Sequence, residues 1–221
     1  PNHAESAEQL AHLLVNDETA VTQLLDKPVN QIDFILDNVG IELIGDLCLA
    51  DYLLSVDQAA TVQLHAKLHP TFVSDATILD VEATIAYLRE ENEPDLQRAG
   101  ERLTDYLVNG RLRLLSHPFW TSPHPLWQLP TDLRQTLAAG ELIISKGDAN
   151  YRRALGDAPW PHTTPIRDIV CYLPTPTLFL RTCKSEVLAG MAQNQLEQLK
   201  QLGRLEEDWL VNGRWGLIQL V

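Results

Sequence analysis

The sequence predicts an α/β protein with three layers, α/β/α, in which helices cover both faces of a mostly parallel sheet. Short buried apolar runs typical of strands alternate with longer segments whose apolar residues recur at helical spacing. The chain has 221 residues, 45% hydrophobic and 21% charged, which is an ordinary globular balance with enough length for a large core. Because such folds bind ligands beyond the carboxyl ends of their strands, functional residues are expected there.

The expected elements follow in order along the chain. Residues 4–27 predict two short polar helices with Asp17 as an N-cap between them. Strands are predicted at 32–36, 62–68, 112–115, 142–144, 177–180 and 216–221, the last as a closing edge strand. Helices are predicted at 41–55, 77–90, 93–109, 148–155 and 186–202, and a loop rich in Pro, His and Trp at 117–130. The predicted division is a helical lead-in over residues 1–30 and an α/β/α domain over residues 31–221.

Composition excludes several classes of function. The net charge of −13 argues against nucleic acid and anionic membrane surfaces, both of which require clustered Lys and Arg. The sequence has no apolar run as long as a membrane span, and its polar start does not resemble a signal peptide. Cys48, Cys171 and Cys183 are too few for a disulfide framework, so we expect reduced thiols and a cytoplasmic protein.

Polar residues follow the first two strands of the predicted domain. Asp37 and Asn38 end the first strand, and Gly40 allows a tight turn after them. Asp75 follows the second strand. Carboxylate and amide oxygens suit Mg²⁺ or Mn²⁺ rather than zinc, so these three residues are candidate metal ligands. The alternative is that each merely caps the helix that follows it.

Two later strands also end in polar clusters. Gly147 opens a helix whose free N–H groups and positive dipole end would attract an anion. Asp148 and Asn150 could hold sugar hydroxyls, and Arg152 and Lys184 a phosphate group. The alternatives are a capped helix with an exposed Arg and an exposed Lys before a helix. Four such clusters at four strand ends favour a binding site over caps alone.

Several long motifs resemble those of the damage-control phosphatase family (domain of unknown function 89). The run from Ile32 to Leu43 resembles its Asp-Asn signature. Further motifs follow in the family's order at Phe72–Asp75, His117–Trp120, Lys146–Arg152 and Arg181–Lys184, the last matching the Arg-Thr-x-Lys motif of subfamily III. The resemblance covers roughly residues 30–190 and is specific because the motifs share order and spacing.

The resemblance implies a function and a set of site residues. Members hydrolyse phosphorylated sugars, in subfamily III fructose phosphates such as fructose 1-phosphate or fructose 6-phosphate, with Mn²⁺ or with Mg²⁺, Co²⁺ or Ni²⁺. The metal would activate a water molecule as the nucleophile. Attack by the Asp37 carboxylate is the alternative mechanism. The implied catalytic and metal-binding residues are Asp37, Asn38 and Asp75. The implied substrate-binding residues are Asp37, Asn38, Asp148, Ala149, Asn150, Tyr151, Arg152 and Lys184.

Two other functions stay open. One is protein-glutamate carboxyl methyltransferase activity, which would use S-adenosylmethionine, although the glycine-rich turn usual in such cofactor sites is missing after the first strand. The other is an inactive half-protein that acts as a binding module. Family members carry a long helical N-terminal region that contacts substrate, whereas about thirty residues precede the first motif here. We therefore expect a missing N-terminal half or a partner chain.

Three further side chains have two interpretations each. Glu42 and Asp46, four residues apart on one predicted helix, are either outer-shell acids behind the metal or solvated surface charges. Tyr151 either stacks on a sugar or packs in the core. The histidines His65 and His69 share a four-residue spacing, but they lie in a predicted strand, where that spacing is too long for one zinc ion, so we interpret them as structural.

Overall fold

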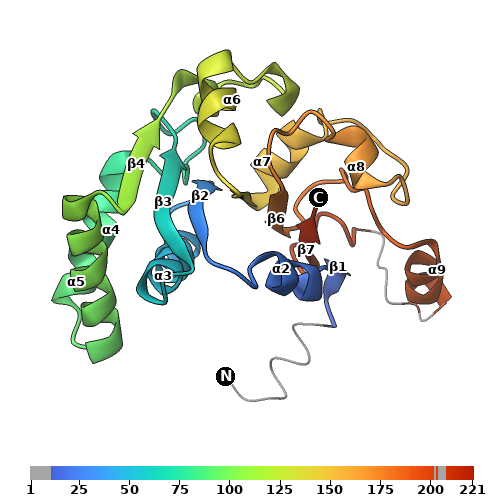
Figure 1. Ribbon diagram of the computed structural model, residues 1–221. Coiled ribbons are helices and arrows are strands. Elements are labelled where there is room, and N and C mark those ends of the chain that lie inside the picture. Colours follow the sequence, from blue (N-terminus) through green and yellow to red (C-terminus); the bar gives the residue numbers. More distant parts are fainter. Residues whose placement is uncertain (1–10, 202, 204–207) are drawn as a thin grey trace.

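A seven-stranded sheet forms the centre of the protein (Figure 1). The computed structural model describes residues 11–201, 203 and 208–221. The strands are β1 (Leu13–Asn16), β2 (Val29–Ile35), β3 (Ala59–Ala66), β4 (Leu112–Ser116), β5 (Leu142–Lys146), β6 (Thr177–Thr182) and β7 (Gly216–Leu220). Their order across the sheet is β1-β7-β6-β5-β2-β3-β4. Strands β6 and β7 pair antiparallel, and the other neighbours pair in parallel.

Helices cover both faces of the sheet, as the sequence predicts. One apolar cluster packs one face against α2 (Glu18–Leu24), α3 (Ile41–Ser55), α4 (Ile78–Glu90) and α5 (Pro94–Asn109). A second cluster packs the other face against η1 (Pro118–Thr121), η2 (Leu126–Gln128), α6 (Thr131–Ala138), α7 (Gly147–Ala154), α8 (Ile166–Ile169) and α9 (Gln193–Gln201). The predicted three-layer architecture with a mostly parallel sheet is therefore confirmed.

The strand order reverses between β2 and β5. From β2 the chain proceeds outward through β3 to β4, and it then returns to β5 on the other side of β2 and continues to β6. The crevice beyond the carboxyl ends of β2 and β5 is thus the topological switch point, where open α/β sheets bind their ligands. Asp37 follows β2 and Gly147 follows β5, so the fold brings two predicted motifs to this crevice.

Two predictions are wrong at the edge of the sheet formed by β1 and β7. Residues 13–16 form the strand β1 instead of a helix, because they pair with β7, about two hundred residues later. Among its described residues, the predicted lead-in is thus helical only in α2, and part of the expected helix lies outside the described residues. Strand β7 is internal and not an edge strand, since β1 covers its outer side. Asp17 precedes α2 but does not cap it with its side chain, which accepts from the Leu220 N–H instead.

The last predicted helix begins later than expected, at Gln193 instead of residue 186. In residues 186–192 the backbone carbonyls of Val187 and Ala189 accept hydrogen bonds from the side chains of Arg181 and Gln219, which hold the segment in a non-helical path. The predicted end at residue 202 lies outside the described residues. Helix α6 had no counterpart in the prediction.

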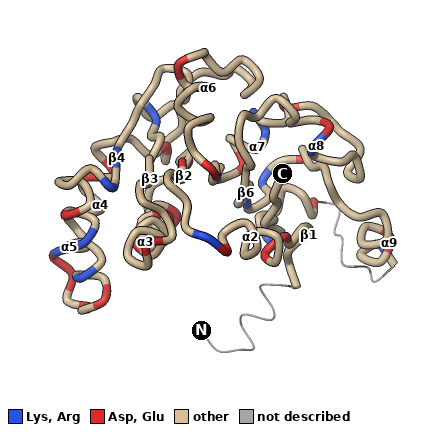
Figure 2. Tube along the Cα trace, viewed as in Figure 1, with Lys and Arg blue, Asp and Glu red and all other residues tan. Residues whose placement is uncertain are grey.

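The charge of the chain is spread over its surface. Figure 2 shows acidic and basic residues interleaved along α5, where such residues usually face solvent. Within the part of the chain that the structure describes, no helix combines the length and the apolar character that crossing a bilayer requires. The three cysteines are free thiols, and Cys183 alone among them is buried.

Candidate functional site

Asp37, Asn38 and Asp75 lie together beyond the ends of β2 and β3. A single antiparallel bridge joins Asn38 to Asp75, and Ala76 N–H donates to the Asp37 carbonyl at 2.9 Å. The Asn38 amide nitrogen donates to Asp37 Oδ2 at 3.0 Å, while its oxygen accepts from Ser74 Oγ at 2.7 Å. The loop before α4 thus folds back onto the end of β2 and brings the two carboxylates to one place.

The helix-cap alternative is wrong for these residues. Helix α3 begins after Gly40 without a side-chain cap, and α4 is capped by a Thr77 capping box with Asp80. The Asp75 carboxylate accepts instead from the N–H groups of Thr71 and Phe72 at 2.9 and 3.0 Å, which shapes the loop. None of the three predicted site residues is therefore used by a helix terminus.

Burial dominates the electrostatics of Asp37. The side chain is 4% exposed, and burial raises its pKa to about 6, with further upward contributions from Glu42, Asp75 and Asp148 that Lys67 partly offsets. A carboxylate that is desolvated and surrounded by like charges is held in an unfavourable state unless a cation joins it. Such perturbed groups mark candidate functional sites.

Asp46 is an inner residue of the site and not a solvated surface charge. It is 1% exposed, and its Oδ1 lies 2.8 Å from Lys146 Nζ, the residue that ends β5. Burial raises the pKa of Asp46 to about 6, although Lys146 lowers it. Glu42, one turn earlier, accepts from the Asn38 amide at 3.1 Å. Both acids on α3 therefore support Asn38 and Lys146 from behind.

Gly147 lets β5 and α7 approach Asp37 closely. Its φ is +80°, and a Cβ atom added here would lie 1.8 Å from Asp37 Oδ2. A glycine is therefore required both for the left-handed backbone and for the space that the Asp37 carboxylate occupies. The close approach of Gly147 to the Asp37 carboxylate thus brings the end of β2 and the start of α7 together at the switch point.

Asp148 organises the neighbouring strand end instead of capping α7. Its Oδ1 accepts from Arg181 Nε at 2.7 Å, the Lys184 N–H at 3.0 Å and Ser185 Oγ at 3.1 Å. The Arg181 side chain is fully buried and also stacks over the Tyr151 ring at 4.3 Å. The Arg-Thr-x-Lys motif is thus held in place by the first acidic residue of α7.

The predicted substrate contacts do not all reach the cleft. Asn150 and Tyr151 have no exposed surface. The Asn150 amide donates to the carbonyls of Leu36 and Lys146, and the Tyr151 hydroxyl donates to Gln219 Oε1 at 3.1 Å. Side-chain contact between these two residues and a sugar is therefore not supported, and the core interpretation of Tyr151 holds.

Two adjoining cavities, of about 430 and 610 Å³, form one cleft. They share Phe72, Asp75, Ala149 and Arg152 as lining residues. The larger cavity is also lined by four more predicted site residues, namely Asp37, Asn38, Asp148 and Lys184. The starts of β1 and β7 border it as well, through Leu13 and Gly216, which sequence analysis did not place near the site.

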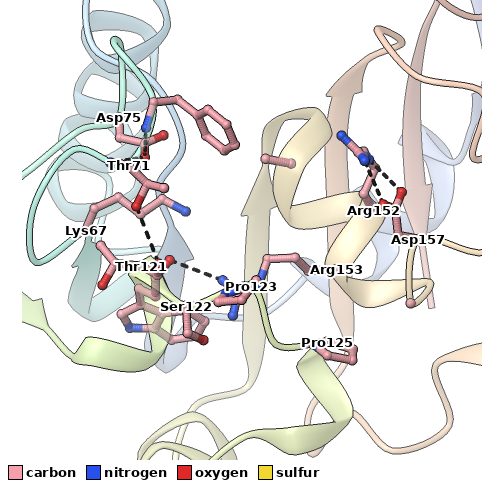
Figure 3. A pocket seen from close by; sticks show the side chains of 14 residues that line it. Lys67, Thr71, Asp75, Thr121, Ser122, Pro123, Pro125, Arg152, Arg153 and Asp157 are labelled. Atoms are coloured by element: carbon pink, nitrogen blue, oxygen red, sulfur yellow. Dashed lines mark hydrogen bonds and ion pairs between the residues drawn. The ribbon is translucent and has the colours of Figure 1, made fainter.

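The smaller cavity contains residues that sequence analysis missed. Lys67 and Thr71 line one wall, and Arg152 and Arg153 of α7 line the opposite wall (Figure 3). A signal for Lys67 was present in the sequence. Strand β3 is buried on both faces, yet Gln63, His65 and Lys67 place polar side chains at every second position of it and beyond its end. Such a stripe in a buried strand indicates polar partners on that face.

The donor set at Asp37, Asn38 and Asp75 fits a hard divalent cation because all available ligands are oxygens. Over residues 11–201, 203 and 208–221, no group of three or more His, Cys, Asp or Glu side chains is arranged as a metal site. Two buried carboxylates would therefore be the principal ligands. The Asn38 nitrogen lies toward Asp37, so its oxygen would join them only after the amide rotates.

The fold and the cleft define the class of this protein: a doubly wound α/β protein whose switch point gathers buried carboxylates and cations. The comparisons identify its family. The chain belongs to the damage-control phosphatase ARMT1-like domain family, whose profile matches residues 2–199. The resemblance inferred from the sequence motifs is thereby confirmed.

Relatives called damage-control phosphatase ARMT1 are similar over nearly the whole chain. The proteins of Mus musculus and Bos taurus are 36% and 37% identical over 218 and 219 residues, 94% of this chain. Each match covers 49% of the relative, so the chain spans about half the length of the curated relatives it matches. A DUF89 family protein from Pyrococcus horikoshii has a similar structure, with a TM-score of 0.48 and 19% identity over 84% of this chain and 48% of that one.

Proposed function

We propose that this chain carries the catalytic cleft of a metal-dependent phosphatase that hydrolyses phosphate monoesters of small sugars, with fructose 1-phosphate and fructose 6-phosphate as the substrates to test first. The observation that supports this most is the desolvated Asp37 carboxylate beside Asp75 at the switch point, near the buried amine of Lys67. Family membership supports the same reaction class.

The residues of the cleft have separate roles in this proposal. Asp37 and Asp75 hold a divalent cation, Mn²⁺ first among the candidates, and Asn38 joins them through its oxygen. When bound, the cation supplies positive charge to the phosphoryl oxygens, which is what phosphoryl transfer mainly requires. Asp148 orders the Lys184 backbone, and Lys184 and Arg152 face the same cleft as cations.

The first experiment measures phosphate release from both fructose phosphates in the presence of Mn²⁺, Mg²⁺ or EDTA. We expect release with a divalent cation and none with EDTA, because the two buried carboxylates otherwise repel the phosphate anion. A folded chain that releases no phosphate from either substrate with any of the metals would contradict the proposal. Incubation of the chain with S-adenosylmethionine and an acidic protein, followed by measurement of methyl transfer to that protein, tests the methyltransferase alternative.

Metal binding should compete with protonation of Asp37. The pKa of Asp37 in the folded chain, about 6, lies above the ordinary 3.8. The protonated carboxyl therefore contributes fully to the free energy of unfolding below about pH 4, and this contribution is lost as the pH rises through 6. Since Mn²⁺ requires the charged form, we expect its apparent affinity to fall about tenfold between pH 7.5 and 5. Titration calorimetry at both pH values measures this.

A variant separates this effect from general acid effects on the protein. Asp37→Asn cannot be deprotonated, so its residual Mn²⁺ affinity should be weak and should change much less over the same pH interval. An Mn²⁺ affinity of the wild-type chain that stays constant from pH 5 to 7.5 would show that Asp37 is not a ligand.

A further inference from the structure

Lys67 is a buried cation without an ion-pair partner among the carboxylates that the structure describes. It follows β3, its backbone N–H donates to the Ala76 carbonyl at 2.9 Å, and its side chain is turned inward to leave the residue 5% exposed. The ammonium donates to Asn150 Oδ1 at 3.4 Å. Among the described residues, no Asp or Glu oxygen lies within 4.0 Å of it. An ammonium group has three N–H donors, so most of its capacity is unused.

The position of Lys67 is electrostatically unfavourable without a ligand. Burial lowers the pKa of its ammonium, Arg153 lowers it further, and Asp37 and Asp75 act in the opposite direction. An isolated buried charge is costly unless it is paired and hydrogen-bonded. The Lys67 amine lies near the two predicted metal ligands, where an anionic ligand would pair with its ammonium form.

The other cations of the cleft are already engaged. Asp157 holds the Arg152 guanidinium through two hydrogen bonds of 2.7 and 2.6 Å. Arg153 donates to the backbone carbonyls of η1 and of the loop after it, and Lys146 is paired with Asp46. The Lys184 side chain is exposed and therefore loses more side-chain entropy on binding. Lys67, by contrast, is buried and keeps most of its N–H donors free.

The cavity in front of Lys67 has room for a small anion beside its cations. Figure 3 shows the Lys67 amine directed into the space between Asp75 and Thr121, with α7 on the far side. The side chains of Thr71, Thr121 and Ser122 border the same space of about 430 Å³, and their hydroxyls donate to backbone carbonyls. In a chain of net charge −13, a local group of cations such as Lys67, Arg152 and Arg153 is what an anionic ligand needs.

We propose that the Lys67 ammonium forms an anion subsite of the cleft and donates to a phosphoryl oxygen of the bound substrate and of the released phosphate. The inference rests on the proposed phosphatase function for the identity of the anion. It adds a phosphate ligand that is separate from Arg152 and Lys184 and lies on the β3 side of the cleft.

The test measures binding of inorganic phosphate to the full chain with Mn²⁺ by titration calorimetry, without any hydrolysis. We expect Lys67→Met to weaken phosphate binding about 10- to 100-fold, which is the loss of one charge-assisted hydrogen bond. The matched control is Lys27→Met, an exposed lysine at the opposite end of β2, for which the dissociation constant should be unchanged. Circular dichroism and melting curves establish that the variants fold, and Lys67→Gln replaces Lys67→Met if the latter does not.

The outcomes keep this inference apart from the proposed function. Phosphate binding that depends on Lys67 in a chain without phosphatase activity would support the subsite and contradict the proposed function. Wild-type-like phosphate affinity in both Lys67 variants, or a loss confined to Lys184→Met, would overturn the subsite even if the chain hydrolyses fructose phosphates. An absence of phosphate binding to the wild-type chain with Mn²⁺ would also overturn it.

Discussion

Asp37→Asn should reduce metal-dependent phosphate release by about 10³-fold or more while leaving the fold at least as stable as the wild type. The catalytic loss is expected because the substitution removes a charged ligand of the proposed cation, and metal ions contribute several kcal/mol to such reactions. The side chain keeps its size and shape, so it still fits against Gly147. Initial rates with saturating Mn²⁺ measure the first effect.

The stability of this variant distinguishes a functional from a structural role. Raising the Asp37 pKa from 3.8 to about 6 corresponds to about 3 kcal/mol against the charged form in the folded chain. Asn removes that penalty, so chemical denaturation at pH 7.5 without metal should show equal or higher stability. Asp105→Asn on the exposed side of α5 is the matched control and should alter neither property. A variant that unfolds, or one that keeps its activity, would contradict the role of Asp37.

Gly147→Ala should reduce phosphate release about 100-fold or more, because the added methyl group takes the space of the Asp37 carboxylate. The separation of 1.8 Å is far inside van der Waals contact, so either the carboxylate or the start of α7 must move. A displacement of about 1 Å in a catalytic group is enough for such a loss. Steady-state rates and Mn²⁺ affinity should both fall.

Gly110→Ala separates this clash from backbone strain. Gly110 ends α5 with a φ of +78°, almost the same as the +80° of Gly147, but an added Cβ meets no atom within 4 Å. Both variants should lose about 1–2 kcal/mol for a left-handed non-glycine residue. Gly110→Ala should nevertheless keep its activity. Equal activity in the two variants would mean that Gly147 does not position Asp37.

Much of the fold can be predicted from the sequence because its signals are local. The predicted helix at residues 41–55 matches α3 residue for residue, and the predicted strands at 32–36 and 142–144 lie at the positions of β2 and β5. In these segments the apolar residues repeat with the period of the element that buries them. The segment that forms β1, Leu13–Asn16, is too short to show such a repeat, and its strand conformation depends on pairing with β7.

The same distinction applies to the cleft. Asp37, Asn38 and Asp75 could be selected from the sequence because residue type and position at a strand end are both local properties. Arg152 could be selected too, but its pairing with Asp157 could not, and neither could the burial of Asn150 and Tyr151. These depend on side-chain direction within the folded chain, which motif position does not specify.

The sequence by itself determined the layers of the fold, the strand ends that carry the polar motifs and the family to which the chain belongs. Only the tertiary structure decided which polar side chains share the switch point, that Gly147 makes room for Asp37, and that Lys67 is buried with no carboxylate partner among the described residues. The physical reason is that desolvation and charge pairing arise between residues far apart in the chain. Their strength depends on distances that only the folded packing sets.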